Sequence, residues 1–114
     1  MPTTKEYKDF ILEKLEMLDN IICKLMIGEY LLYYNGIYFG GICDNRLMVK
    51  IVQINKKYML TEQLPYEGAK PMYVIDDLEN KELIKEIIVE TCICLANKKK
   101  WVKWEFSDLD SHFL

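Results

Sequence analysis

Four charged side chains and three tyrosines have the chemistry that a polar site would need. They are Glu29, Tyr30, Tyr34, Lys50, Tyr66, Glu67 and Lys70. Carboxylates, amines and phenols that converge could perform general acid–base catalysis or bind a polar ligand. The alternative is that these residues form surface ion pairs and line strand faces, where they contribute little. We therefore treat them as candidate ligand- or partner-binding residues and assign no catalytic residue.

The cysteines do not form a recognisable metal site. The chain contains Cys23, Cys43, Cys92, Cys94 and a single histidine, His112, and no two cysteines form a C-x-x-C pair. Zinc sites have strong spacing preferences, so a site here would require all four cysteines to converge from distant parts of the chain. We expect reduced cysteines that pack as small core hydrophobes, and neither a metal nor a cofactor.

Length and composition are typical of one globular domain. The chain has 114 residues, 51% of them hydrophobic and 29% charged, and a net charge of −3. Because dedicated nucleic-acid-binding proteins usually carry a basic excess, this balance argues against direct nucleic-acid binding, although a local basic patch remains compatible with it. The apolar runs are too short to span a bilayer and the first residues lack a signal-peptide pattern, so we expect a cytoplasmic protein without membrane contact.

The elements that must position these side chains begin with a three-stranded meander. Asn35-Gly36 lies between two apolar, aromatic runs, and this pair strongly predicts a hairpin because a type I′ turn needs positive φ at both central residues. Asp44-Asn45 has similar turn chemistry. The predicted strands are Glu29–Tyr34, Ile37–Cys43 and Arg46–Ile51.

Glycines interrupt the predicted strands at two places. Gly28 divides the run Ile21–Tyr34, which we interpret as one interrupted strand or two short strands in line. Gly40-Gly41 lies inside the second strand of the meander, where it favours a bulge or close packing against a helix. A small concave site is the functional alternative for this glycine pair.

Two helices are predicted to flank the strands. Thr3 or Thr4 can cap the first helix, which should end at Asp19-Asn20. Asn80 can cap the second helix, which should end near Asn97.

Less regular segments lie between the meander and the second helix. Val52–Thr61 could hold a short helical turn or a loop, Leu64–Pro71 has the prolines and glycine of a turn, and Met72–Ile75 is predicted to be the last strand. Together the pattern predicts an α+β, two-layer sandwich: a mostly antiparallel sheet of about five strands with an N-terminal and a C-terminal helix.

The last segment, Lys98–Leu114, differs in composition from the rest. Four lysines alternate with two tryptophans in residues 98–104, and acidic residues follow. Such a segment could bind single-stranded nucleic acid or a membrane surface. We favour an arm whose aromatic residues dock on the domain or on a second copy while its lysines stay solvated. The expected organisation is a domain over residues 1–97 and a C-terminal arm over residues 98–114.

Several segments of the chain have a recognisable composition and order. They are Met26-Ile27-Gly28-Glu29-Tyr30, Tyr33-Tyr34-Asn35-Gly36, Gly41-Ile42-Cys43-Asp44-Asn45-Arg46, Val49-Lys50, Leu64-Pro65-Tyr66-Glu67-Gly68-Ala69-Lys70 and the helix entry Asp76-Asp77…Asn80-Lys81-Glu82. These segments resemble the TfoX N-terminal-domain family, found at the front of the bacterial competence regulators TfoX and Sxy and alone in small bacterial proteins. The resemblance covers about residues 4 to 96 in the family's order. The resemblance implies a two-layer sandwich with an antiparallel sheet, and a regulatory or protein-interaction role linked to competence gene expression.

We therefore expect a non-enzymatic regulatory or protein-interaction module. Its partner would be another protein or a second copy of the chain, since a meander with an edge strand and an aromatic arm could form a homodimer. The alternative is a small-ligand-binding protein or an enzyme that uses Glu29, Lys50, Glu67 and Lys70.

Overall fold

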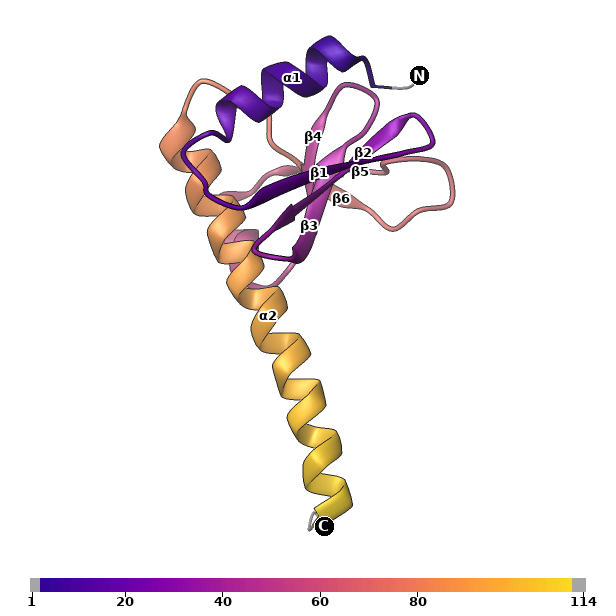
Figure 1. The fold of residues 1–114 in the computed structure, drawn as a ribbon, viewed down its shortest axis with the longest axis vertical. Helices are drawn as coiled ribbons and strands as arrows, with labels where there is room; N and C mark the ends of the chain where they lie inside the picture. Colours follow the sequence, from indigo (N-terminus) through magenta and orange to yellow (C-terminus); the bar gives the residue numbers. More distant parts are fainter. Residues whose placement is uncertain (1–2, 112–114) are drawn as a thin grey trace.

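The computed structural model describes residues 3–111, with side chains for residues 3–97. Figure 1 shows helix α1 followed by a strand-rich region and a long second helix, α2. The elements are α1 (Lys5–Lys14), β1 (Ile21–Met26), β2 (Glu29–Tyr34), β3 (Ile37–Ile42), β4 (Leu47–Val49), the 3₁₀ helix η1 (Ile54–Tyr58), β5 (Thr61–Gln63), β6 (Met72–Val74) and α2 (Lys81–Ser111).

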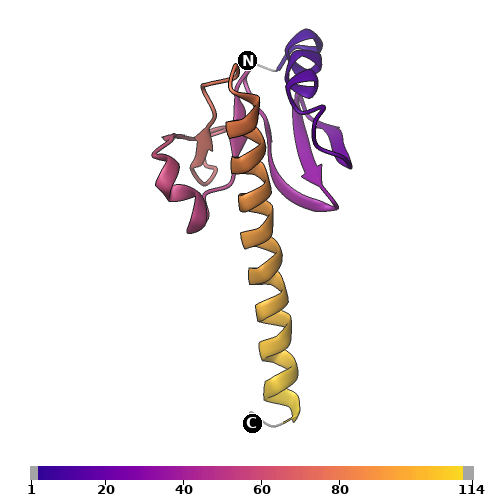
Figure 2. The same cartoon turned by 90° about the vertical axis from the view of Figure 1, so that its left-hand side faces the viewer.

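One sheet contains all six of these strands. Its order is β1-β2-β3-β4-β6-β5, and every neighbouring pair is antiparallel. Both helices pack on the same face of the sheet, which curves around α2 (Figure 2). The predicted two-layer α+β fold with a helix at each end is therefore confirmed. The polar strand β5 was not predicted.

Three two-residue turns connect the first four strands. Asn35-Gly36 and Asp44-Asn45 have positive φ throughout, as a type I′ turn requires. The third turn, Ile27-Gly28, has φ values of 42° and 77°. It reverses the chain, so β1 and β2 form a hairpin in which Met26 pairs with Glu29. The prediction of one interrupted strand or two strands in line over Ile21–Tyr34 was therefore wrong.

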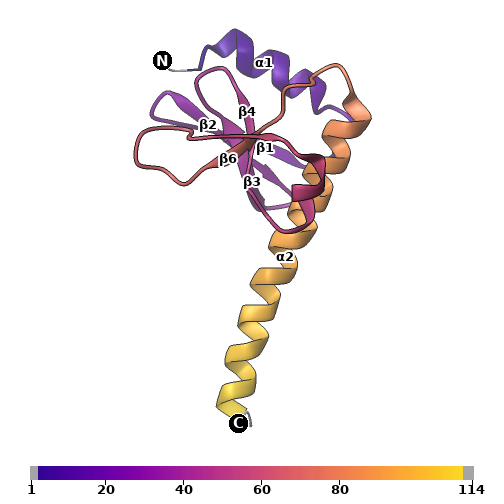
Figure 3. The same cartoon turned by 180° about the vertical axis from the view of Figure 1, so that it is seen from behind.

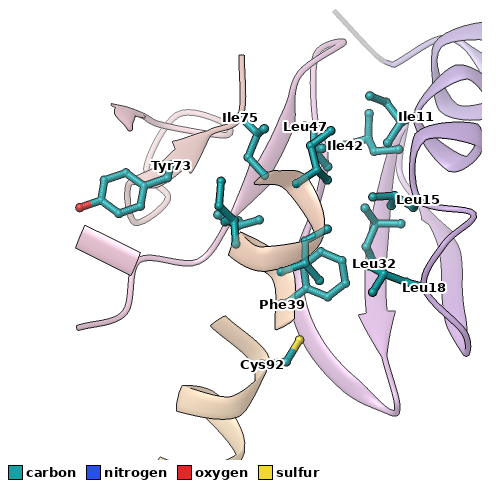
Figure 4. Close-up of a cluster of buried hydrophobic side chains, with 14 residues drawn as sticks. Ile11, Leu15, Leu18, Leu32, Phe39, Ile42, Leu47, Tyr73, Ile75 and Cys92 are labelled. Carbon is teal, nitrogen blue, oxygen red and sulfur yellow. The ribbon is translucent and has the colours of Figure 1, made fainter. Parts of the chain in front are cut away.

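The core lies between the sheet and the two helices. Ile11 of α1, Leu15 directly after it, and Ile84, Ile87 and Ile88 of α2 are almost fully buried. They pack on side chains from one face of the sheet, and burying each such aliphatic side chain contributes roughly 1.5–3 kcal/mol. Figure 4 shows the sheet's part of this cluster, which includes Leu32, Phe39, Ile42, Leu47, Tyr73 and Ile75.

Gly40-Gly41 allows close approach of neighbouring strands. The register of β2 and β3 shifts between Leu32 and Tyr33, which confirms the predicted bulge. A Cβ on Gly40 would collide with the carbonyl oxygen of Met48, and one on Gly41 with that of Tyr30. The backbone of the neighbouring strands therefore fills the space beside Gly40 and Gly41. The prediction had named a packed helix or a concave site as the alternatives to a bulge there.

Both helices begin at predicted caps, but both end elsewhere than predicted. Asn80 precedes α2, and its side-chain oxygen accepts a hydrogen bond from the Leu83 amide. Thr4 is the N-cap of α1, and its hydroxyl accepts a hydrogen bond from the Tyr7 amide. Helix α1 ends at Lys14, before the predicted end at Asp19-Asn20. Residues 15–20 form tighter turns, in which Leu15 and Leu18 are still buried.

Helix α2 continues to Ser111, past the predicted end at Asn97. No glycine or proline follows Asn97, so nothing in the sequence stops the helix there. The predicted arm therefore begins as helix. The predicted docking of its aromatic residues concerns side chains outside the described set.

Helical turn η1 lies in the segment for which a helical turn or a loop was predicted. Asn55 holds it: its amide nitrogen donates to the Lys50 carbonyl at 2.8 Å and to the Thr91 hydroxyl at 2.9 Å, and its amide oxygen accepts from the Val52 amide. Since Asn55 and Thr91 are fully buried, these bonds connect η1 to the residue after β4 and to α2.

Candidate functional site

The sheet has a second face, turned away from both helices. Residues that alternate with the core positions of β1, β2 and β3 point to this side. We call it the open face and define it by Ile22, Lys24, Glu29, Leu31, Tyr33 and Tyr38.

Four of the seven candidate residues gather at or beside the open face. Glu29 lies on it, and the Lys50 ammonium lies 4.2 Å from the centroid of the Tyr38 ring. Tyr66 and Lys70 lie in the loop between β5 and β6. Beside the larger effect of burial, Tyr66 contributes to the raised pKa of Tyr38 and Lys70 to the lowered pKa of Lys50.

The other three candidates lie elsewhere. Tyr30 and Tyr34 alternate onto the helix-covered face and pack against the core. Lys8 of α1 lies 5.6 Å from the centroid of the Tyr30 ring, which places this phenol under the first helix. Glu67 is exposed in the β5–β6 loop. The seven residues therefore do not form one site.

Tyr33 and Tyr38 form the centre of the open face. They are opposite each other on β2 and β3, with ring centroids 5.5 Å apart and ring planes tilted by 42°. Lys24 lies 5.2 Å from the Tyr33 ring centroid. The prediction omitted Tyr33, Tyr38 and Lys24, although a two-residue turn at Asn35-Gly36 already implies that Tyr33 pairs with Tyr38.

Glu29 lies beside a buried thiol. Burial, together with the neighbouring Glu29 carboxylate, raises the pKa of Cys43 to about 12. Burial and the nearby Cys43 and Tyr33 raise the pKa of Tyr38 above its usual value. Both groups therefore stay protonated at neutral pH, where neither can act as a nucleophile or a base.

Arg46 anchors the β5–β6 loop beside the open face. Its guanidinium donates to the side chain of Gln63 and to the Leu64 carbonyl, and its Nε donates to the Cys43 carbonyl at 3.3 Å. Figure 3 shows this loop projecting away from α2. The anchored loop brings Tyr66 and Lys70 to their positions.

Strand β1 is an exposed edge of the sheet. Within the described chain it pairs only with β2, so one side of its backbone has no strand partner. Leu25 is 69% exposed, and Ile27 in the adjoining turn is 94% exposed. We call Ile21–Ile27 the β1 edge.

A second polar cluster joins η1 to α2. The Tyr58 hydroxyl lies 2.8 Å from carboxylate oxygens of both Glu86 and Glu90, and Lys57 forms an ion pair with Glu90 at 3.0 Å. Burial and the two carboxylates raise the pKa of Tyr58, and hydrogen bonds from Lys57 and Tyr58 lower that of Glu90. The cluster acts as a structural clamp between the two helices.

A shallow groove of about 650 Å³ lies where η1 meets α2. Ile54 and Ile93 form its most exposed apolar walls. None of the seven candidate residues lines it.

The described residues contain neither a candidate metal site nor a candidate membrane-spanning helix. No group of three His, Cys, Asp or Glu side chains there could hold a metal ion. No helix in that part of the chain combines the length and apolar character needed to cross a membrane.

Comparison with known proteins gives one informative similarity. No family model matches the chain. An uncharacterized 12.7 kDa protein in the trpE 5′ region of Spirochaeta aurantia is 30% identical over 102 residues, which are 87% of this chain and 89% of that protein.

Proposed function

This chain belongs to the family of the uncharacterized 12.7 kDa protein of Spirochaeta aurantia, and we propose that it is a non-enzymatic regulatory module that binds a partner protein. The regulatory role and a cytoplasmic location are proposed from the sequence, including its resemblance to the TfoX N-terminal-domain family. The candidate side chains support this choice over an enzyme, because they are divided between the two faces of the sheet and the β5–β6 loop.

The observation that carries the proposal is the β1 edge. An edge strand presents unpaired N–H and C=O groups to which an extended peptide can add as a further strand. Here the edge also presents the large apolar side chains of Leu25, Met26 and Ile27 to solvent. Burying them under a partner would add hydrophobic free energy of roughly 25 cal/mol per Å² to the backbone hydrogen bonds.

The backbone of Ile27 gives independent support. Its φ of 42° lies in the left-handed region, which is costly for a β-branched residue. The Asn35-Gly36 and Asp44-Asn45 turns use Asn, Gly or Asp at such positions. A strained and exposed isoleucine at the end of the edge is consistent with selection for binding.

The test is capture of a partner from the lysate of the source cells with immobilised full-length protein. We expect at least one protein to be captured by the parent and to be lost with Leu25→Lys, which places a charge in the apolar contact. Light scattering on the same samples identifies the case in which the partner is a second copy.

The matched control is Met59→Lys. Met59 is 88% exposed and also has a positive φ, but it follows η1 rather than β1. The proposal would be contradicted if both variants lost capture equally. It would also be contradicted if the parent and the Leu25→Lys variant captured the same proteins.

A further inference from the structure

The charge around the open face is positive, whereas the net charge of the whole chain is negative. The chain carries three more acidic than basic side chains, yet the open face and the loop beside it carry Lys24, Lys50 and Lys70 around the tyrosine pair. The acidic residues of the same region are Glu29 on the open face and the exposed Glu67 in the loop, so the three lysines leave a net positive charge. In residues 3–97, no ion pair joins any of these three lysines to a carboxylate.

The lysines are positioned for an external anion. Partial burial and the neighbouring Lys70 both lower the pKa of Lys50, so the charged form of Lys50 is disfavoured. An anion placed between the two amines would offset this effect. Lys24 extends the positive charge along the other side of the tyrosine pair.

Tyr33 and Tyr38 supply flat surfaces beside this charge. No helix covers these two adjacent rings, but the ammonium groups of Lys24 and Lys50 lie over them. A nucleobase can stack on each ring when the lysine moves from the ring to a phosphate of the same strand. Stacking requires unpaired bases, which a duplex does not offer. An acidic protein segment would use the lysines but would have no need for the ring pair.

We propose that the open face binds single-stranded nucleic acid, with bases stacked on Tyr33 and Tyr38 and phosphates held by Lys24, Lys50 and Lys70. This activity is separate from protein binding at the β1 edge, and neither depends on the other.

The test is fluorescence anisotropy with a fluorescein-labelled ten-nucleotide single strand, the matching duplex and a ten-residue polyglutamate peptide, using the full chain. We expect the single strand to bind more tightly than the other two probes. Replacing both tyrosines by leucine should weaken binding about 5- to 150-fold per stacked base. The double variant Lys50→Gln/Lys70→Gln should reduce the slope of log affinity against log salt by about 1.4, or ~0.7 per lost phosphate contact.

Two control variants separate this face from other basic groups. Lys5→Gln/Lys85→Gln removes the same charge from exposed positions on α1 and α2 and should leave the salt slope unchanged. Changing Lys98, Lys99 and Lys100 to glutamine removes three of the four lysines of the C-terminal segment and should preserve the dependence on the tyrosines. Thermal unfolding by circular dichroism verifies that each variant is folded.

Four outcomes would overturn the proposal. In the first, the single strand does not bind at low salt. In the second, the two lysine pairs change the salt slope equally, and in the third the variant of Lys98–Lys100 loses all binding. In the fourth, the duplex or polyglutamate binds as tightly as the single strand or more tightly. If the tyrosine variant fails to fold, the comparison between the two lysine pairs still decides the outcome.

Discussion

At the scale of single residues, the proposed role of Ile27 in binding opposes its effect on stability. Its left-handed backbone costs roughly 1–2 kcal/mol relative to residues that tolerate this region. Ile27→Asn should therefore raise the free energy of unfolding by about 1 kcal/mol, measured by urea denaturation, while it weakens capture of the partner. A variant that is less stable than the parent would show that Ile27 supports the turn and would remove the argument from strain.

Cys43 allows a residue-scale test of the contact with Glu29. The Cys43 pKa of about 12 predicts slow reaction with a thiol reagent at pH 8 in the folded protein, because the thiolate is the reactive form. Glu29→Gln removes a negative charge beside the sulfur, so the Cys43 pKa should fall and labelling should accelerate. Mass spectrometry of labelled peptides measures this rate. The internal control is Cys92, whose pKa is raised to about 12 by burial alone, without a neighbouring carboxylate. An equal change at both cysteines would point to general loosening of the fold.

At the scale of elements, most local signals were predictable, except the Ile27-Gly28 turn, and long-range pairings were not. Asn35-Gly36 and Thr4 act within a few residues, so the meander and the first helix cap follow from sequence. The insertion of β6 between β4 and β5 depends on contacts between distant segments. The position of Tyr30 under α1 depends on strand register and helix packing, which residue types alone do not specify.

The clamp between η1 and α2 has a predictable response to acid. The pKa of Glu90 is lowered from 4.5 in the folded state by hydrogen bonds from Lys57 and Tyr58. Its contribution to stability is therefore present above pH 4.5 and is lost as the pH falls through the folded pKa below that value. The difference in melting temperature between pH 7 and pH 3 should be smaller in Glu90→Gln than in the parent.

The control for the clamp is Glu13→Gln on α1. Glu13 is exposed and has no ion pair in the described part of the chain. Equal reduction of acid sensitivity in the two variants would show that the clamp is not its source.

At the scale of the whole molecule, the two proposed binding surfaces share a hairpin but use different chemistry. Strand β1 supplies backbone and apolar groups at its edge, and Lys24 from the same strand faces the tyrosine pair. A partner added along β1 would lie beside the nucleic-acid face without covering Tyr38. The two proposed sites could therefore be occupied at the same time on one molecule, by a protein and by a single strand.

The long helix gives a test of which residues form the folding unit. Every residue of α2 that is described as buried lies between Ile84 and Cys92, and Figures 1 and 2 show the helix continuing beyond the sheet. A chain ending after Asn97 should therefore keep the parent's free energy of unfolding within about 0.5 kcal/mol, measured by urea denaturation. A chain ending after Glu90 lacks buried Cys92 and also Thr91, which accepts a hydrogen bond from buried Asn55. Its free energy of unfolding should fall by at least ~2 kcal/mol. If removal of residues 98–114 is as damaging as the shorter truncation, the C-terminal segment is part of the fold and the boundary at residue 97 is wrong.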